Sequence, residues 1–173
     1  MRVSIQEPDA TQKAASHISA LLRKIDPDQK RPRILLSIGT DRLTGDSLGP
    51  LVGSRMANRL PCYGTLDEPV HAVNLAEKIR EIGQKYQNPL IIAVDACLGQ
   101  IGTVGTVSIE QEALIPGTGV HKNLPPAGEI AISGVVNVGG FLEYLVLQNT
   151  RLCLVMQLAE CIAGALAAAT AEA

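Results

Sequence analysis

Apolar and polar residues along the chain follow two alternating patterns. Between Thr11 and Ile25 the apolar residues recur every three or four positions, which is typical of a helix with one buried face. Around residues 34–36 and 90–94 the apolar residues are instead consecutive, and short runs of this kind are typical of strands buried on both faces. Strands that alternate with helices predict an α/β sandwich with a mainly parallel sheet.

The two patterns divide most of the chain into predicted elements. A single domain is expected over residues 1–173, with residues 1–30 as an N-terminal helix and linker. Between the elements, Ile115–Gly128 carries three prolines and three glycines and is predicted to be a long loop. The predicted helices are Thr11–Ile25, Leu48–Arg59, Leu75–Tyr86, Val138–Gln148 and Leu158–Ala171, and the predicted strands are Arg33–Gly39, Tyr63–Leu66, Pro89–Asp95, Thr103–Ile109 and Arg151–Met156.

Composition excludes several classes of function. The net charge is −2, aromatic residues make up 2% of the chain, and no basic tract is present, so nucleic acid is not expected as a partner. The four cysteines are far apart in sequence, which favours a reducing cytoplasm over a disulfide or zinc framework. Residues 152–169 form the one stretch apolar enough to suggest a membrane span, but Gln157 and Glu160 interrupt it. A buried strand followed by a helix is the interpretation we favour, with no membrane partner.

Candidate chemistry is sought at the carboxyl ends of the predicted strands, where α/β sheets form their sites. Three places qualify. The first is the glycine-rich loop after Gly39, which holds Thr44 and Asp46; the second is Asp95, which ends an apolar run; the third follows Met156 and includes Glu160. The loop fits neither a phosphate-binding P-loop nor a dinucleotide fingerprint, because its glycines have the wrong spacing.

Asp46 and Asp95 are the residues with the clearest chemical meaning. A carboxylate after five apolar residues is partly desolvated, and two carboxylates at neighbouring strand ends can share a proton or activate a water. Each also has a structural alternative: Asp46 could cap the next helix, and Asp95 could bind backbone N–H groups of the following turn. Cys97 is interpreted as a buried thiol rather than a nucleophile, and His121 is the one histidine placed near the carboxylates.

Three separated motifs point to a known family. They are Ile38-Gly39-Thr40 followed by Thr44-Gly45-Asp46-Ser47-Leu48-Gly49-Pro50, then Ile92-Ala93-Val94-Asp95-Ala96, then Pro116-Gly117-Thr118-Gly119-Val120. In this order they resemble the sporulation protein YyaC family, whose relatives include the spore germination protease. The resemblance covers roughly residues 31–166 and implies a three-layer α/β/α fold of the hydrogenase maturation protease type.

The resemblance also implies an activity. In the germination protease the aspartates of the two matching motifs are the proposed catalytic carboxylates, and they correspond to Asp46 and Asp95. The chain is therefore expected to be a cytoplasmic, aspartate-dependent peptidase of spore-forming bacteria without a cofactor, with a peptide or small acid-soluble spore proteins as substrate. The expected substrate-binding residues are Gly39, Thr40, Thr44, Gly117, Gly119 and His121.

Two rival functions stay open at this point. One is a metal-assisted peptidase, with Asp46 and Asp95 joined by His121 or Glu160 as ligands. The maturation proteases bind nickel through a histidine, and the comparable stretch 132–137 has none. The other rival is a sporulation factor that holds a peptide in the same cleft without cleaving it.

Overall fold

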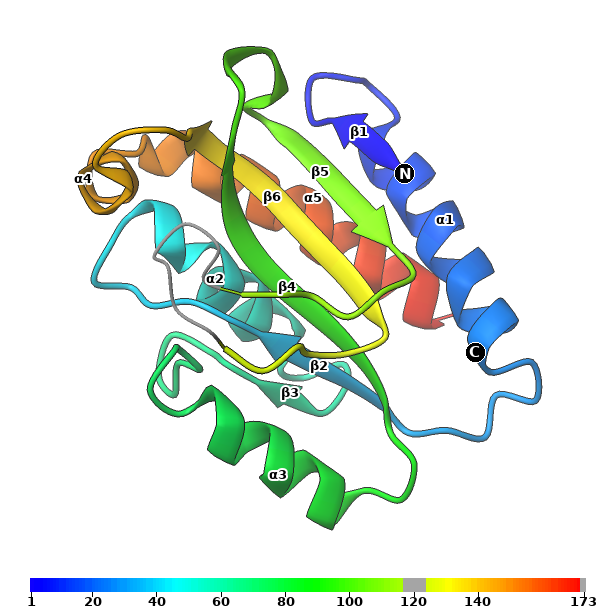
Figure 1. Cartoon of the computed structure of the whole chain (residues 1–173). Coiled ribbons are helices and arrows are strands. Elements are labelled where there is room, and N and C mark those ends of the chain that lie inside the picture. The colour runs from blue at the N-terminus through cyan, green and yellow to red at the C-terminus, as the bar shows by residue number, and fades with distance from the viewer. Residues whose placement is uncertain (117–123, 172–173) are drawn as a thin grey trace.

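A six-stranded mixed sheet forms the centre of the computed structural model, which describes residues 1–116 and 124–171 (Figure 1). β5 runs antiparallel to both of its neighbours, and the other five strands run in one direction. The sequence prediction of a mainly parallel sheet is confirmed. The strand order is β1 (Arg2–Ser4), β5 (Thr106–Glu110), β6 (Ile130–Val138), β4 (Leu90–Gly99), β2 (Arg33–Ser37) and β3 (Cys62–Tyr63).

The two faces of the sheet bury alternate residues against different layers. Leu35, Ile92 and Val94 face a core formed with three helices: α1 (Ala10–Ile25), α2 (Leu48–Met56) and α5 (Leu152–Ala171). Ile34 and Leu36 face the opposite side, where α3 (Leu75–Lys85) packs. Helices therefore lie on both faces, as the three-layer prediction requires (Figure 1).

Coverage of the second face is incomplete. α3 packs over β2 and the neighbouring part of β4, and the segments around Leu114 and Ala127 add a few apolar contacts. Over β5 and β6, the part of the chain that the structure describes places no helix on this face (Figure 1). The side chains of Ser108, Glu110 and Ser133 lie on this open side, where they line a hollow.

The sequence prediction was wrong for the segment that precedes the last predicted helix. Residues 151–156 were expected to form a strand, but Leu152 begins a single helix that continues to Ala171. No turn residue separates the two predicted elements, and leucine, methionine, glutamine and alanine all favour a helix. Because this segment is not a strand, the third candidate place, after Met156, is not at a strand end. The strand that pairs in parallel with β4 on its other side is β6, which was not predicted.

α5 is also long and apolar enough to cross a membrane by length and composition. In this fold it serves as a core helix: half of its most apolar window is buried, and it packs between α1 and α2. Val155, Leu158 and Ile162 are among its buried side chains. Its apolar composition is thus accounted for by burial inside the fold.

Candidate active site

Asp46 is positioned by the turn that leaves β2. Gly39 has φ +140°, and a Cβ at this position would lie 2.1 Å from the backbone carbonyl oxygen of Asp46, so only glycine fits. The N–H of Thr40 donates to that same carbonyl at 3.0 Å. Asp46 itself lies in the short 3₁₀ helix η1 (Gly45–Ser47). The Gly39–Thr40 backbone therefore fixes the residue that carries the carboxylate, and the substrate-binding role expected of Gly39 and Thr40 stays a prediction.

The capping alternative for Asp46 is wrong. Ser47 occupies the N-cap position of α2, and Thr44 occupies that of η1. Thr44 is half-buried, and its backbone carbonyl accepts a bond from Ser47 Oγ at 2.7 Å. A substrate-orienting role for the Thr44 hydroxyl stays a prediction.

Asp95 lies beside the end of β2, but not at the end of its own strand. β2 pairs with β4 as far as Val94, whereas β4 continues to Gly99 because β6 pairs with it along that length. The prediction that the strand ends at Asp95 was therefore wrong by four residues. Asp95 Oδ1 accepts the N–H of Ala96 at 2.8 Å, so the backbone bond foreseen as its structural alternative exists, although within a strand rather than a turn.

The two carboxyl groups influence each other electrostatically. Burial raises the pKa of Asp46 to about 6. Burial is also the main reason that the pKa of Asp95 lies well above its ordinary value, and the negative charge of Asp46 raises it further. Within the described residues, neither carboxylate forms an ion pair with lysine or arginine. The charge of Asp46 thus acts on Asp95, and two like charges disfavour the ionised form of each other.

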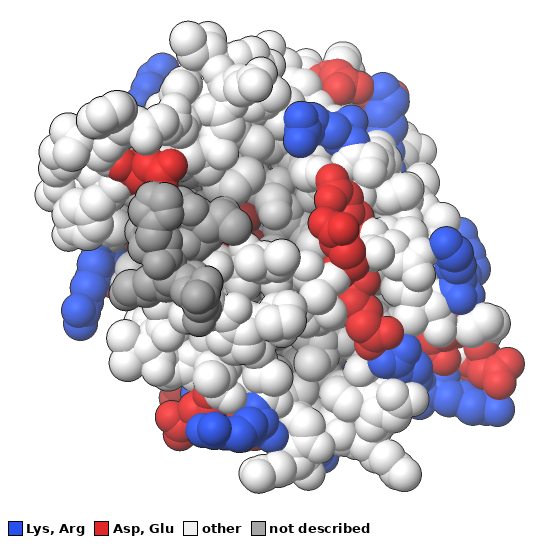
Figure 2. Space-filling model, viewed as in Figure 1, with Lys and Arg blue, Asp and Glu red and all other residues white. Residues whose placement is uncertain are grey.

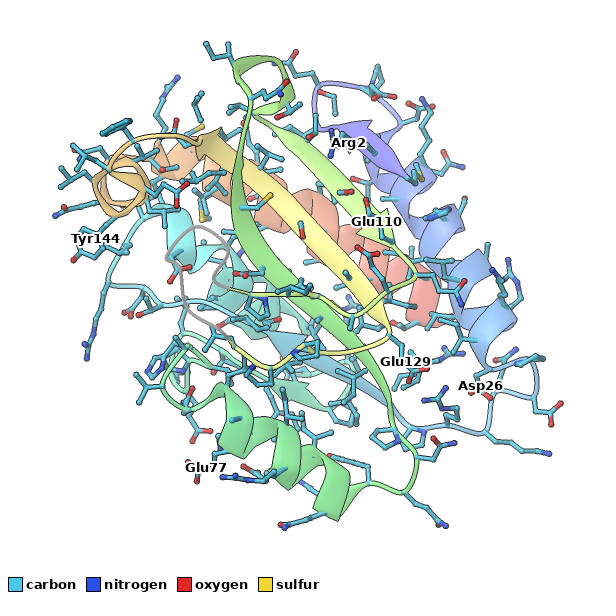
Figure 3. The ribbon with its side chains drawn as sticks, in the orientation of Figure 1. Arg2, Asp26, Glu77, Glu110, Glu129 and Tyr144 are labelled. Carbon is cyan, nitrogen blue, oxygen red and sulfur yellow. The ribbon has the colours of Figure 1, made fainter. Side chains whose placement is uncertain are left out.

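Asp95 also borders a hollow on the open face of the sheet. This cavity of about 220 Å³ is lined by residues that include Asp95, Ser108, Glu110, Glu112 and Ser133. Figure 2 shows acidic side chains along this face, and Figure 3 labels Glu110 and Glu129 there. Asp46 does not line this cavity. A larger hollow of about 1010 Å³, between the turn before α1 and the start of α5, holds neither aspartate.

The remaining predicted site residues have different outcomes. Gly117, Gly119 and His121 lie outside the described residues. Glu160 is on α5, where it is exposed and lies 3.7 Å from Arg55. Across the described ranges no three His, Cys, Asp or Glu residues form a group that could hold a metal ion, so the metal-assisted alternative with Glu160 as the third ligand is wrong. Burial raises the pKa of Cys97 to about 11, with a further contribution from Asp95, and its thiol is protonated at neutral pH.

Sequence reasoning missed the elements that support η1. A Cβ at Gly45 would lie 2.8 Å from Leu147 Cδ2 and 2.9 Å from Thr150 Oγ1, so α4 (Glu143–Gln148) and the residues after it pack directly on η1. Thr150 is buried, and Asn137 Nδ2 donates to its hydroxyl at 3.2 Å. These partners are about a hundred residues from Gly45 in sequence, and no local pattern connects them.

Comparison with known proteins places the chain in a family. The family described as "Protein of unknown function (DUF1256)" matches residues 2–165. The chain belongs to this family. A curated relative, "Uncharacterized protein YyaC" of Bacillus subtilis (strain 168), is 48% identical over 168 residues, covering 95% of this chain and 80% of the relative. The resemblance to the YyaC family is confirmed.

The chain is also similar to a solved structure. It is described as a crystal structure of a [NiFe] hydrogenase maturation protease, HycI, from Thermococcus kodakarensis KOD1. The TM-score is 0.49 and the sequence identity 19%, over 87% of this chain and 98% of that one.

Proposed function

We propose that this chain is a peptidase in which Asp46 and Asp95 act together on a water molecule. One observation carries the proposal: two carboxyl groups from separate elements lie close enough that the charge of one raises the pKa of the other. Such a pair is costly to bury. Pairs whose environments separate their pKa values are typical of general acid–base catalysis.

The two pKa shifts support a division of roles between the general base and the general acid. With a pKa of about 6, Asp46 is mostly ionised at neutral pH and can accept a proton from the attacking water. Burial and the charge of Asp46 raise the pKa of Asp95 well above its ordinary value, so we assign Asp95 as the acid that protonates the leaving amine. The water oxygen bonds to the peptide carbonyl carbon as the water loses a proton to Asp46, and the C–N bond breaks as Asp95 protonates the nitrogen. Transfer of the proton from Asp46 to Asp95 then restores the starting state.

The substrate proposed for this activity is a polypeptide. Resemblance to the germination protease makes small acid-soluble spore proteins the first candidates, and cleavage would take place in the cytoplasm of a sporulating cell. Neither a nucleic acid nor a membrane enters the proposal.

Asp95→Asn provides the test, because it retains the shape of the side chain and its bond to the N–H of Ala96 while removing the acid. Cleavage of small acid-soluble spore protein is expected to fall by about 10²–10⁴-fold, the usual contribution of a general acid or base. Asp46→Asn should have an effect of similar size. Asp41→Asn is the matched control, because Asp41 is exposed on the same loop.

Circular dichroism of each variant establishes that the fold is retained. Equal cleavage by the wild type and Asp95→Asn would refute the carboxylate mechanism. Measurable peptide binding by the wild type without any cleavage would support the rival function of a peptide-holding factor. Loss of activity on chelation, restored by one stoichiometric metal, would instead support a metal-assisted reaction.

A further inference from the structure

β4 extends beyond β2 on one side. Pairing between β2 and β4 ends at Ser37 and Val94, and the N–H of Ile38 adds one more bond, to the Val94 carbonyl, at 2.7 Å. On its other side β4 continues to pair with β6 as far as Gly99. From Ala96 to Gly99, β4 therefore has a strand neighbour on one side only within the described part of the chain. We call this side the open edge.

The backbone groups on the open edge can be identified. Successive residues of a strand direct their N–H and C=O groups to opposite sides. The Val94 carbonyl accepts from Ile38, on the β2 side, and the Gly99 carbonyl accepts from Gly139, on the β6 side. Ala96 and Leu98 therefore point toward the open edge. Ala96 already donates its N–H to Asp95 Oδ1. Across residues 1–116 and 124–171 no bond from a loop or another strand to the Ala96 carbonyl or the Leu98 N–H is found on this side, so both groups can bind another backbone.

An exposed group of apolar side chains follows the C-terminal end of β6, next to which β4 ends. Four side chains in and before α4 are exposed: Phe141 by 92%, Leu142 by 67%, Tyr144 by 59% and Leu145 by 46%. We call these four residues the apolar patch. The bond from Gly139 N–H to the Gly99 carbonyl, 2.8 Å long, fixes the start of this segment at the C-terminal end of β4, on its β6 side.

The composition of the apolar patch is unusual for this chain. It holds the single phenylalanine and one of the three tyrosines, in a protein whose core consists mainly of aliphatic residues. Leu142 also adopts φ 53°, a conformation that large side chains disfavour. Exposed aromatic and aliphatic side chains grouped in this way are typical of a binding surface.

We propose that an extended segment of the polypeptide substrate binds along the open edge as an added strand, with one end beside Asp95 and an apolar side chain on the apolar patch. This inference rests on the proposed function and specifies how its substrate binds. The free carbonyl of Ala96 and N–H of Leu98 match the groups of one extended residue of a partner strand. Four strand residues span about 10 Å, so a short peptide reaches both ends.

The test measures binding separately from cleavage. A phage-displayed library of random dodecapeptides is selected on the immobilised full chain carrying Asp95→Asn, and the best peptide is synthesised with a fluorescent label. Its affinity is then compared for Leu98→Pro and Leu98→Ala in that same background. Both substitutions remove the leucine side chain, but only proline removes the edge N–H. Proline at an unpaired edge donor is compatible with a strand, and circular dichroism checks that both variants are folded.

Leu98→Pro is expected to bind the peptide about tenfold more weakly than Leu98→Ala, since one backbone hydrogen bond and its unpaired acceptor are lost. A second measurement does not depend on proline. Phe141→Ser should weaken binding severalfold, whereas Val73→Ser, which changes a residue that is 87% exposed before α3, should not. Equal affinities for Leu98→Pro and Leu98→Ala, or no peptide enriched over a blank surface, would overturn the proposal.

Two further results separate the possibilities. Self-association of the chain that Leu98→Pro abolishes, seen by light scattering, would assign the open edge to a second copy and overturn the proposal. If the selected peptide binds as expected but the wild type cleaves no polypeptide, the binding mode stands and the peptidase proposal fails. If the wild type cleaves polypeptides and Leu98→Pro cleaves them as fast as Leu98→Ala does, the peptidase proposal stands and the proposed binding mode fails.

Discussion

Replacing Asp46 by asparagine should stabilise the folded chain at neutral and alkaline pH. A pKa of about 6 in the fold, against an ordinary value of 3.8, corresponds to about 3 kcal/mol of unfavourable free energy for the ionised carboxylate. The cause is desolvation, which penalises the charged form. Asparagine has a similar shape and no charge, so it avoids this cost.

The pH dependence has a definite sign. Below about pH 4 the carboxyl is protonated in both the folded and the unfolded chain, and Asp46 causes no pH-dependent change in stability. Between about pH 4 and 6 the unfolded chain releases the proton while the folded chain retains it, so stability falls as the pH rises. Above pH 6 the full penalty remains. The stability advantage of Asp46→Asn should therefore grow from near zero at pH 4 to about 3 kcal/mol at pH 8.

Urea unfolding at several pH values between 4.5 and 8 measures this difference, provided that the wild type and the variant share one slope. Asp41→Asn, on the exposed part of the same loop, should change the free energy of unfolding by less than about 0.5 kcal/mol. The reasoning would be refuted if Asp46→Asn were no more stable than the wild type at pH 8, because the ionised carboxylate would then carry no desolvation penalty in the fold.

Two further predictions concern packing and thiol chemistry. Gly49→Ala should lower the free energy of unfolding by about 2 kcal/mol or more, because its Cβ would lie 2.0 Å from the Ile38 carbonyl oxygen. Gly83→Ala, whose Cβ would meet nothing within 4 Å, should raise it by about 0.5 kcal/mol. Thermal and urea unfolding compare the two variants, and similar effects would contradict the packing described. Iodoacetamide at pH 7 should alkylate the exposed Cys153 before Cys62 and Cys97, because burial raises the pKa values of Cys62 and Cys97 to about 12 and 11. Peptide mass spectrometry checks this order, and early modification of Cys97 would mean that its thiol is activated.

The sequence predicted the parts of the fold whose patterns are unambiguous. α1, β2 and α3 each combine a clear apolar period with a turn or breaker at the end, and their bounds agree with prediction within about two residues. β1 was missed because three residues with one buried side chain, Val3, leave no pattern to detect. β6 was missed because Ser133 and Gly134 interrupt its apolar run.

α5 shows a different limit. A continuous apolar run such as residues 152–156 suits a buried strand and a buried helix equally, and periodicity cannot separate them. The carboxyl-end rule selected the loop that carries Asp46 because it depends on β2, which was predicted correctly. The support of η1 by α4 could not be predicted, because it depends on a tertiary contact between Gly45 and Leu147.

The position of β1 in the sheet has a consequence for the order of folding during synthesis. β1 pairs with β5, and the amino group of Met1 bonds to the carbonyl of Ile109, 108 residues away. At roughly 5–20 residues per second, the ribosome needs about 5–20 s to supply that partner. α1 waits longer, since the helix on which it packs, α5, ends at Ala171. The apolar stripe of α1 is thus synthesised more than a hundred residues before the helix that buries it, and in the interval it is a surface that a chaperone can bind.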